Sequence, residues 1–288
     1  MPELAVRLRP LLEECAQLLR RARIAEPRRE ALRLWADISG TSPVVTLLGE
    51  HLLSDSEAAE LRQATSRRAR GEPLSYVTGV VGFRHLSLRI DRRALIPRPE
   101  TEGLVELLLQ RVQSGVVADI GTGSGCIAVS LAQEGSFARV VAIDSSGESV
   151  ALAEANAAAL GFSKTVDLVR ADLCTPLRTE SCHALISNPP YLTPEEYAGL
   201  DPCVRDWEPA VALRSGTDGM DATSAIIREG GRVLKPGGWL AMEVDCSRAA
   251  AAAQMAGQHG WEDVSIHKDL FGRERYLLAR RSENGDLG

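Results

Sequence analysis

Four successive residues, Asn188-Pro189-Pro190-Tyr191, could do chemistry, and they follow the apolar run CHALIS at 182–187. Proline has no backbone N–H and a fixed φ, so two successive prolines end strand pairing and stiffen the chain. This Asn188 corner, residues 188–191, can be an ordinary turn, because Asn-Pro and Pro-Pro are common at turns. It can also hold carbonyl groups in fixed positions beside a ligand. The four residues alone leave both interpretations open.

A planar –NH₂ group, on a carboxamide or an aminopurine, is the acceptor that suits such a corner. Its nitrogen is a poor nucleophile because the lone pair is delocalised. The Asn188 side-chain carbonyl and the Pro189 backbone carbonyl could each accept one N–H, orienting the nitrogen and stabilising the positive charge that develops on it. The Tyr191 ring would pack on the planar group. We therefore predict that Asn188, Pro189 and Tyr191 are catalytic and that residues 188–191 bind the substrate.

A second candidate site is the glycine loop, residues 121–125, within VVADIGTGSGCIAVSLA at 116–132. This pattern predicts a strand, a tight loop and a helix. The three glycines allow close approach of the backbone to a ligand, and the helix N-terminus offers free N–H groups to negative charge. Asp144, 19 residues after Gly125, ends the next predicted strand and is placed to bind two ribose hydroxyls. The loop therefore predicts a cofactor that contains a nucleoside.

Several loop types compete for this pattern. A nicotinamide site prefers G-x-G-x-x-G, whereas this loop has G-x-G-x-G, and the Gly-Lys-Ser/Thr of a phosphate loop is absent. A plain turn between a strand and a helix explains the glycines less well, given the correctly spaced acid. S-adenosylmethionine fits best, with Asp119 facing its amino group and loop N–H groups facing its carboxylate.

A third strand end carries Asp172 and Leu173, in VRADL. Asp172 can bind the exocyclic amine of adenine with Leu173 beside the ring, or it can be an ordinary turn or cap residue. The order of the strand-end sites favours cofactor binding. The predicted cofactor-binding set is therefore Asp119, Gly121, Thr122, Gly123, Ser124, Gly125, Asp144, Asp172, Leu173 and Asn188.

The composition of the 288-residue chain is that of a soluble globular protein, with 25% charged and 44% hydrophobic residues. Residues 1–72 carry 12 basic and 11 acidic side chains and the remainder 21 and 28, so we expect no stable nucleic-acid partner. The six cysteines form no C-x-x-C pair, and we expect no metal and no disulfide framework. There is no run long enough to cross a membrane and no targeting pattern, which predicts a cytoplasmic protein.

The pattern of elements predicts an α/β protein with three parts. Residues 1–72 show helical periodicity only, including a capping-box spacing from Ser54 to Glu57. Residues 73–97 alternate with period two, from SYVTG through HLSLRI, and predict a β-hairpin linker. Residues 98–288 alternate strands and helices, which predicts a mostly parallel, Rossmann-like sheet. Its seven expected strands are 116–120, 138–144, 165–171, 182–187, 238–244, 263–267 and 275–280, and its expected helices lie near 125–134, 146–160, 220–234 and 247–259.

Ordered motifs give the chain a family resemblance: YVTG (76–79), LIPRPETE (95–102), DIGTGSGCIA (119–128), SNPPY (187–191), EPAVAL (208–213), GTDGM (216–220) and GRERY (272–276). Over nearly its whole length the chain resembles the release factor glutamine N5-methyltransferases, the HemK/PrmC family of class I S-adenosylmethionine-dependent methyltransferases. The resemblance implies methylation of the glutamine in the Gly-Gly-Gln motif of class 1 peptide chain release factors. It implies that residues 188–191 hold this glutamine, and that residues 121–125, Asp144, Leu173 and Asn188 contact the cofactor.

IPRPETE at 96–102 resembles the family's segment beside the cofactor, and it can also be a helix start capped by Thr101. Two places depart from the family pattern: Glu243-Val244-Asp245, where Glu-Ile-Gly or Glu-His-Gly is common, and Phe83-Arg84-His85, where Phe-x-Gly is common. We expect both to lie outside the Asn188 corner and His85 to be a surface residue of the hairpin. We further hypothesise that residues 1–72 dock the release factor away from its glutamine.

Two other functions remain open from the residues. A DNA adenine-N6 methyltransferase is the main alternative, because the corner suits either kind of –NH₂; the acidic balance of residues 73–288 and the absence of an evident recognition insert argue against it. A non-enzymatic binding module would need a broken glycine loop or corner, and neither is broken.

Overall fold

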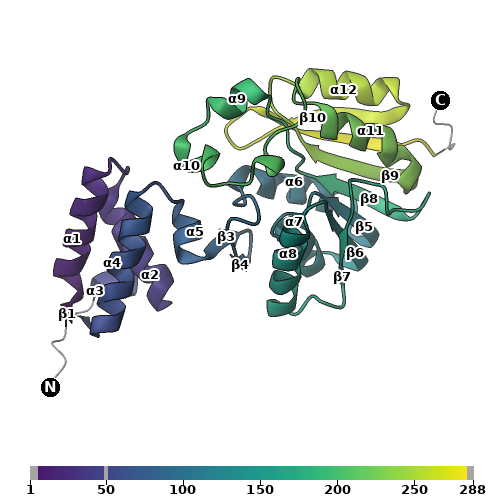
Figure 1. Ribbon diagram of the computed structural model, residues 1–288. Helices are drawn as coiled ribbons and strands as arrows, with labels where there is room; N and C mark the ends of the chain where they lie inside the picture. Colours follow the sequence, from purple (N-terminus) through teal and green to yellow (C-terminus); the bar gives the residue numbers. More distant parts are fainter. Residues whose placement is uncertain (1–5, 49–50, 284–288) are drawn as a thin grey trace. The chain divides into compact units, whose positions relative to one another are not determined.

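A computed structural model describes residues 6–48 and 51–283 of the chain (Figure 1). The parts of the predicted domains at 1–5, 49–50 and 284–288 lie outside the described residues. Contacts divide the chain into two compact units. One unit contains the described residues up to Val80 together with Asp201–Trp207; the other contains Val81–Leu200 and the described residues from Glu208 onwards. The three-part division at residues 72 and 97 stays a prediction.

The N-terminal unit is built from helices. They are α1 Leu8–Arg21, α2 Pro27–Ser39, α3 Pro43–Leu48, α4 Asp55–Ala69, α5 Leu74–Thr78 and α10 Pro202–Arg205. Leu19, Leu34 and Leu61 are fully buried between them, as the helical periodicity predicts. The capping box is confirmed, because Ser54 and Glu57 hydrogen-bond each other's backbone N–H groups. The expectation of helices alone is wrong in one detail: β1 Val6–Arg7 pairs with β2 Leu52–Leu53.

The predicted hairpin is present but shorter than its alternating pattern. Its strands are β3 Val80–Phe83 and β4 Leu86–Arg89, which pair with each other. The preceding SYVTG residues form most of α5, so the expectation that Val77 lies in a strand is wrong. Gly79 ends this helix in the left-handed region, with φ 75°, where glycine meets no steric penalty. One turn of helix between a proline and a glycine looks like a strand when only apolar alternation is considered.

A seven-stranded sheet forms the second unit, as the sequence predicts. Its strands are β5 Ser114–Ile120, β6 Ser136–Asp144, β7 Val166–Arg170, β8 Cys182–Ser187, β9 Leu234–Glu243, β10 Trp261–Lys268 and β11 Glu274–Arg281. Their order is β10-β11-β9-β8-β5-β6-β7, and only the pairings of β11 are antiparallel. The helices of this unit are α6 Pro99–Leu109, α7 Cys126–Glu134, α8 Gly147–Ala159, α9 Pro194–Ala198, α11 Asp221–Val233 and α12 Ala249–Gln258, with a 3-10 turn at Ala210–Ala212. The predicted fold class is confirmed.

The register of the parallel strands places the predicted site residues at one edge. Ile120 at the end of β5 pairs with Ser187 at the end of β8 and with Ile143 in β6. The residues that follow these strands, including the glycine loop and the Asn188 corner, therefore start side by side. Ligands of open α/β sheets bind at this carboxyl edge. The carboxyl-terminal halves of β5, β6 and β8 are buried on both faces, which explains their continuous apolar sequences.

Candidate active site

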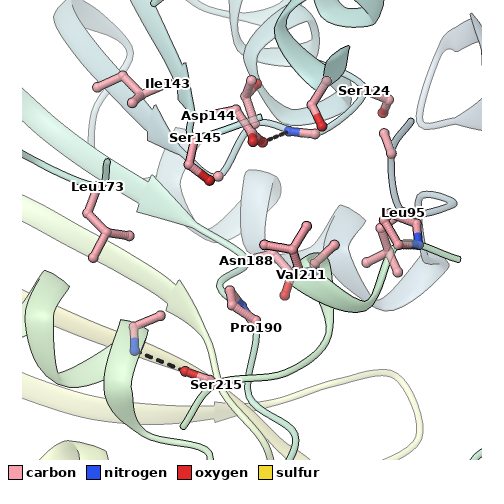
Figure 2. A pocket seen from close by; sticks show the side chains of 18 of the residues that line it. Leu95, Ser124, Ile143, Asp144, Ser145, Leu173, Asn188, Pro190, Val211 and Ser215 are labelled. Carbon is pink, nitrogen blue, oxygen red and sulfur yellow. Dashed lines mark hydrogen bonds between the residues drawn. The ribbon is translucent and has the colours of Figure 1, made fainter. Parts of the chain in front are cut away.

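A cavity of about 510 Å³ lies at the carboxyl ends of the parallel strands (Figure 2). Its walls come from the glycine loop, from the ends of β6 and β8 and the segment after β7, and from the segments 94–101 and 209–216 with the start of α11. Figure 2 shows apolar side chains on opposite walls, Ile143 and Leu173 on one side and Leu95 on the other. The glycine loop and Asn188, far apart in the sequence, thus line one cavity.

The glycine loop has a conformation that requires its glycines. Gly121, Gly123 and Gly125 have φ values of 75°, 56° and 81°, which other residues rarely adopt. The N–H groups of Gly121 and Thr122 donate to the Ile143 carbonyl at 2.8 and 2.9 Å. Because Gly121 lines the cavity and an added Cβ there would meet no atom within 4 Å, the space beside it is open to a ligand.

Internal hydrogen bonds occupy most of the loop's donors. Gly123 N–H donates to Asp144 Oδ2 at 2.9 Å, and Gly125 N–H donates to the Thr122 carbonyl at 2.8 Å. Within the described part of the chain, Ser124 N–H alone among the five loop amides has no acceptor in the protein. The predicted contact of loop amides with a carboxylate stays a prediction, and Ser124 is the donor best able to make it.

Asp144 is held at the cavity by two backbone donors. Its Oδ2 accepts from Gly123 N–H and its Oδ1 accepts from Ser146 N–H, both at 2.9 Å. A carboxylate oxygen has more than one acceptor position, so each oxygen can accept a further hydrogen bond from a ligand. A carboxylate fixed in this way suits a pair of neighbouring hydroxyls.

Asp119 lies behind the glycine loop and does not line the cavity. Its side chain is completely buried, and Oδ2 accepts from Thr122 Oγ1 at 2.6 Å. Burial raises the pKa of Asp119 to about 7, with a smaller lowering by the Thr122 hydrogen bond. The predicted contact of Asp119 with a cofactor amino group stays a prediction; the contact that the structure contains is with the loop itself.

Asp172 and Leu173 both line the cavity, and their contact with adenine stays a prediction. The Asp172 carbonyl accepts from both the N–H and the hydroxyl of Thr175, so Asp172 also begins a turn. Leu173 has φ 43°, a conformation that is strained for a branched side chain. The turn therefore coexists with placement at the cavity, and the strained Leu173 is held against the wall.

The Asn188 corner is fixed by a side chain from α6. Asn188 and Pro190 line the cavity, whereas Pro189 is buried and Tyr191 lies outside the lining. Asn188 Nδ2 donates to Thr101 Oγ1 at 3.1 Å, and Thr101 Oγ1 donates to Glu243 Oε2 at 2.7 Å. The expected cap role of Thr101 is wrong, since α6 begins after Arg98 without a side-chain cap and Thr101 is turned inward instead.

Glu243 joins the Asn188 corner from the end of β9 through Thr101, and it is the residue of Glu243-Val244-Asp245 that agrees with the family pattern. The side chain is 2% exposed. Burial raises the pKa of Glu243 to about 7, and hydrogen bonds from Thr101 and Tyr191 and the charge of Arg275 oppose this shift. Burial also raises the pKa of Tyr191 above its ordinary range, so its hydroxyl stays protonated. Packing of the Tyr191 ring on a substrate amide stays a prediction.

The other departure, Phe83-Arg84-His85, is at the hairpin turn. His85 is exposed, as expected, whereas Arg84 is mostly buried and pairs with Glu134 at 2.5 Å and Glu106 at 2.9 Å. Arg84 has φ 49°. Its ion pairs fix the hairpin to α6 and α7 at a turn where a glycine would be less strained.

Part of the cavity wall was not predicted as functional. Glu208, whose side chain is 1% exposed, accepts from Ile96 N–H at 3.1 Å and from Arg98 Nη2 at 2.6 Å. These bonds hold segment 209–216 beside segment 94–101. Ser215 accepts from the N–H of Ala222 at 3.0 Å and so joins this wall to α11 (Figure 2). The motif EPAVAL contains Glu208, and GTDGM begins directly after Ser215, so these two motifs were the signal that could have found this wall.

The residues present fit S-adenosylmethionine. A glycine-rich backbone loop, a fixed carboxylate and an apolar wall match its amino acid, ribose and adenine parts. Among residues 6–48 and 51–283, no cluster of His, Cys, Asp and Glu could hold a metal ion, and no helix is long and apolar enough to span a bilayer. All six cysteines are free thiols.

Comparisons with known proteins match both parts of the chain to one family. Residues 10–79 match the family model of the PrmC N-terminal domain, and residues 99–199 match the methyltransferase small domain. The chain is 37% identical to the release factor glutamine methyltransferase of Nitratidesulfovibrio vulgaris, over 96% of this chain and 95% of that protein. It is 39% identical to the protein of that name from Cereibacter sphaeroides, over 90% and 93%.

Solved structures show the same fold at low identity. A methyltransferase from Pyrococcus furiosus gives a TM-score of 0.53 at 17% identity, over 77% of this chain and 98% of that chain. The ribosomal protein L11 methylase of Lactobacillus delbrueckii subsp. bulgaricus gives 0.50 at 20% identity, over 70% and 98%. With these relatives and this cavity, the chain belongs to the release factor glutamine methyltransferase family of S-adenosylmethionine-dependent enzymes.

Proposed function

We propose that the protein methylates the side-chain amide nitrogen of the glutamine in the Gly-Gly-Gln motif of class 1 peptide chain release factors. The observation that carries this proposal is the orientation of the Asn188 amide. Its Nδ2 is bound to Thr101, so Oδ1 is left as an acceptor at the wall of the cavity. An acceptor at that place suits a substrate that presents N–H groups.

The glycine loop, Asp144 and the wall of Leu173 would hold S-adenosylmethionine, with Asp172 at the adenine end. When bound, the cofactor supplies a sulfonium methyl group: the N–C bond forms as the C–S bond breaks, its electron pair stays on sulfur, and the amide proton leaves to water. The protein's task is to place the glutamine nitrogen in line with that methyl group. Fixed placement of two reacting groups accounts for a large part of the acceleration that such enzymes achieve.

The Asn188 Oδ1 and the Pro189 carbonyl would each accept one N–H of the glutamine amide. Within the described residues, neither oxygen accepts a hydrogen bond from the protein, so both are available. Their dipoles face the charge that develops on nitrogen, and the prolines prevent the backbone from moving away. No general base is needed, because the proton is lost after the nitrogen becomes more acidic.

The N-terminal unit would dock the release factor at a surface away from the glutamine. A groove of about 300 Å³ between α1 and α4 supports this, and Leu18, 38% exposed, lies on its edge beside Arg21 and Arg62. Methylation of the release factor would take place in the cytoplasm, where peptide release occurs. The acidic balance of residues 73–288 disfavours duplex DNA as the substrate.

The test is a methyl-transfer assay with radiolabelled S-adenosylmethionine, in which full-length release factor and duplex DNA are supplied separately. We expect label on the Gly-Gly-Gln glutamine only, and a loss of roughly a thousandfold in kcat for Asn188→Ala, because an acceptor used in the transition state is removed. Label on DNA with the release factor unmodified would replace this proposal by adenine methylation.

The same assay tests docking at the groove of the N-terminal unit. Leu18→Asp should raise KM for whole release factor and leave KM for a short Gly-Gly-Gln peptide unchanged; an equal effect on both would exclude docking at this groove.

A further inference from the structure

A side-chain carboxamide fits its site in two orientations that have almost the same shape. One orientation presents the oxygen, an acceptor, and the other presents the –NH₂ group, a donor. For Asn188 the difference decides activity, because a donor facing the –NH₂ of glutamine would repel it. The proposed function therefore requires some group to select one orientation of the Asn188 amide.

We infer that Thr101 and Glu243 are positioning residues, which together hold the Asn188 amide with Oδ1 toward the substrate. This inference rests on the proposed function and adds two residues to it. The three residues come from α6, from the end of β8 and from the end of β9. The hydrogen bonds join residues 87 and 142 positions apart, so they exist only in the folded unit.

The direction of each hydrogen bond follows from the number of protons available. The Glu243 carboxylate has no proton to give, so Thr101 donates its single hydroxyl proton to Oε2, at 2.7 Å. That hydroxyl can then only accept from Asn188, which must turn its Nδ2 toward it, at 3.1 Å. Asn188 Oδ1, at the other end of the carboxamide group, is then directed away from the Thr101 hydroxyl. The carboxylate thus determines which atom of Asn188 is available to the substrate.

The surroundings of Glu243 agree with this role better than with a structural ion pair. Thr101 and Glu243 are each 2% exposed, and a buried carboxylate without compensation is costly. Arg275 is the nearby cation, but its Nε pairs with Asp269 Oδ2 at 3.3 Å. Among the described residues, Glu243 has no ion pair within 4 Å.

The other titratable groups that face Glu243 are Tyr191, Tyr276 and Glu100. The Tyr191 hydroxyl lowers the pKa of the Glu243 carboxyl group, and the Glu100 charge raises it. Both tyrosines keep their protons at neutral pH, because burial raises the pKa of each hydroxyl. The hydroxyl from which the carboxylate accepts a hydrogen bond is therefore that of Thr101.

Protonation of Glu243 would reverse the chain of hydrogen bonds. A neutral carboxyl group can donate to Thr101, whose own proton is then free to bind Asn188 Oδ1. The amide would turn and present its –NH₂ to the substrate. The orientation of Asn188 is thereby linked to the charge on a residue that does not touch the substrate.

The test compares Thr101→Val, which keeps the shape but removes the hydroxyl, with Thr101→Ser, which keeps the hydroxyl. We expect Thr101→Val to lower kcat by about 10- to 100-fold with KM for S-adenosylmethionine within about threefold, as for loss of an orienting contact. Thr101→Ser should stay within about threefold of wild type. Wild-type kcat in Thr101→Val would overturn the inference, whereas absence of any label on release factor with the wild-type protein would instead refute the proposed function.

A pH profile separates this role from simple packing. Because the pKa of Glu243 is raised to about 7, wild-type kcat at saturating cofactor should fall below that pH, and Glu243→Gln should abolish this fall. Asp119, also with a pKa of about 7, lies behind the glycine loop, so its titration should alter cofactor affinity rather than kcat at saturation. The same acidic fall in Glu243→Gln would overturn the inference.

A measurement without substrate tests the orientation directly. In ¹⁵N-labelled full-length protein, the side-chain N–H protons of Asn188 should exchange with water at least about tenfold faster in Thr101→Val than in wild type, because their acceptor is gone. Thr101→Ser should retain wild-type protection. Equal exchange in wild type and Thr101→Val would contradict the hydrogen bond on which the inference rests, whatever the enzyme's substrate is.

Discussion

The glycine loop and the Asn188 corner line the same cavity, but they are held by contacts of different range and kind. The loop amides donate to the backbone carbonyls of Ile143 and Thr122 and to the Asp144 side chain, 21 residues from Gly123. The corner is held by Thr101, 87 residues from Asn188, and through it by Glu243. The loop depends on backbone geometry, whereas the corner depends on side-chain atoms and their protons. Different substitutions should therefore impair the two halves of the site, the glycine loop and the Asn188 corner.

The largest expected effect concerns two buried carboxyl groups, Glu243 behind the Asn188 corner and Asp119 behind the glycine loop. The pKa of Glu243 is about 7 in the folded protein and 4.5 ordinarily. A carboxyl group whose pKa is raised by folding stabilises the fold at pH values below its unfolded-state pKa. This stabilisation is lost as the pH rises through its folded-state pKa. We expect the free energy of unfolding to fall by about 3 kcal/mol per such group between about pH 4.5 and 7, at about 1.4 kcal/mol for each pKa unit.

Urea unfolding at pH 5 and pH 8 measures this contribution. Glu243→Gln cannot ionise, so its free energy of unfolding should decrease less between the two pH values than that of wild type. Asp119→Asn should do the same for the glycine-loop half, where the pKa is also about 7. If neither variant changed the pH dependence, burial of these carboxyl groups would not govern the stability of either half.

A second prediction concerns backbone geometry in the glycine loop. Gly121→Ala places a Cβ at φ 75°, in the open space beside the cavity, and should raise the Kd for S-adenosylmethionine by about tenfold or more. The matched control is Gly161→Ala, at φ 84° and also without an atom within 4 Å, but outside the cavity. Both variants should lose about 1 kcal/mol of stability, since both strain the backbone.

Isothermal titration calorimetry compares the two glycine variants. Weaker cofactor binding in Gly161→Ala than in Gly121→Ala would mean that backbone strain acts through the whole fold and not at the cavity. Activity of Thr101→Val, by contrast, should fall without a change in this Kd, which would separate the two halves experimentally.

The smallest effect is expected for a contact of shortest range, the capping box of α4. Ser54→Ala removes a side-chain acceptor for Glu57 N–H, three residues along, and should cost about 1 kcal/mol of stability. Ser56→Ala, in the same helix and exposed, should be close to neutral. Thermal unfolding measures both. Reduced kcat on a short peptide in Ser54→Ala would show that this cap affects more than the stability of its own unit.

Sequence patterns of short range predicted most of the fold. All seven strands were expected, because apolar runs between glycines mark buried strands, and residues of the glycine loop line one cavity with Asp144. Errors arose where a local pattern was ambiguous, as in the single turn of α5. Another error came from Thr101, which has the sequence context of a helix cap but contacts Asn188 and Glu243 instead.

The partners of the Asn188 corner could not be predicted because nothing in the sequence near Asn188 identifies them. Glu243 ends β9, and only the order of the strands places β9 beside β8. The wall formed by Glu208 and Ser215 was missed for the same reason: its hydrogen-bond partner Ile96 is 112 residues away. Motif spacing thus locates residues that bind a ligand through local backbone, but not those that are oriented by distant side chains.

The segment Asp201–Trp207 belongs to the N-terminal unit although the chain on both sides of it belongs to the other unit. Arg68 hydrogen-bonds Cys203 within that unit, and a Cβ on Gly71 would lie 3.8 Å from Trp207 Nε1. For protein engineering, the two units therefore cannot be separated by a single cut in the sequence. A fragment starting at Val81 would keep this segment but lose the helices on which it packs. A chimera that exchanges the N-terminal helices should therefore exchange residues 201–207 together with them.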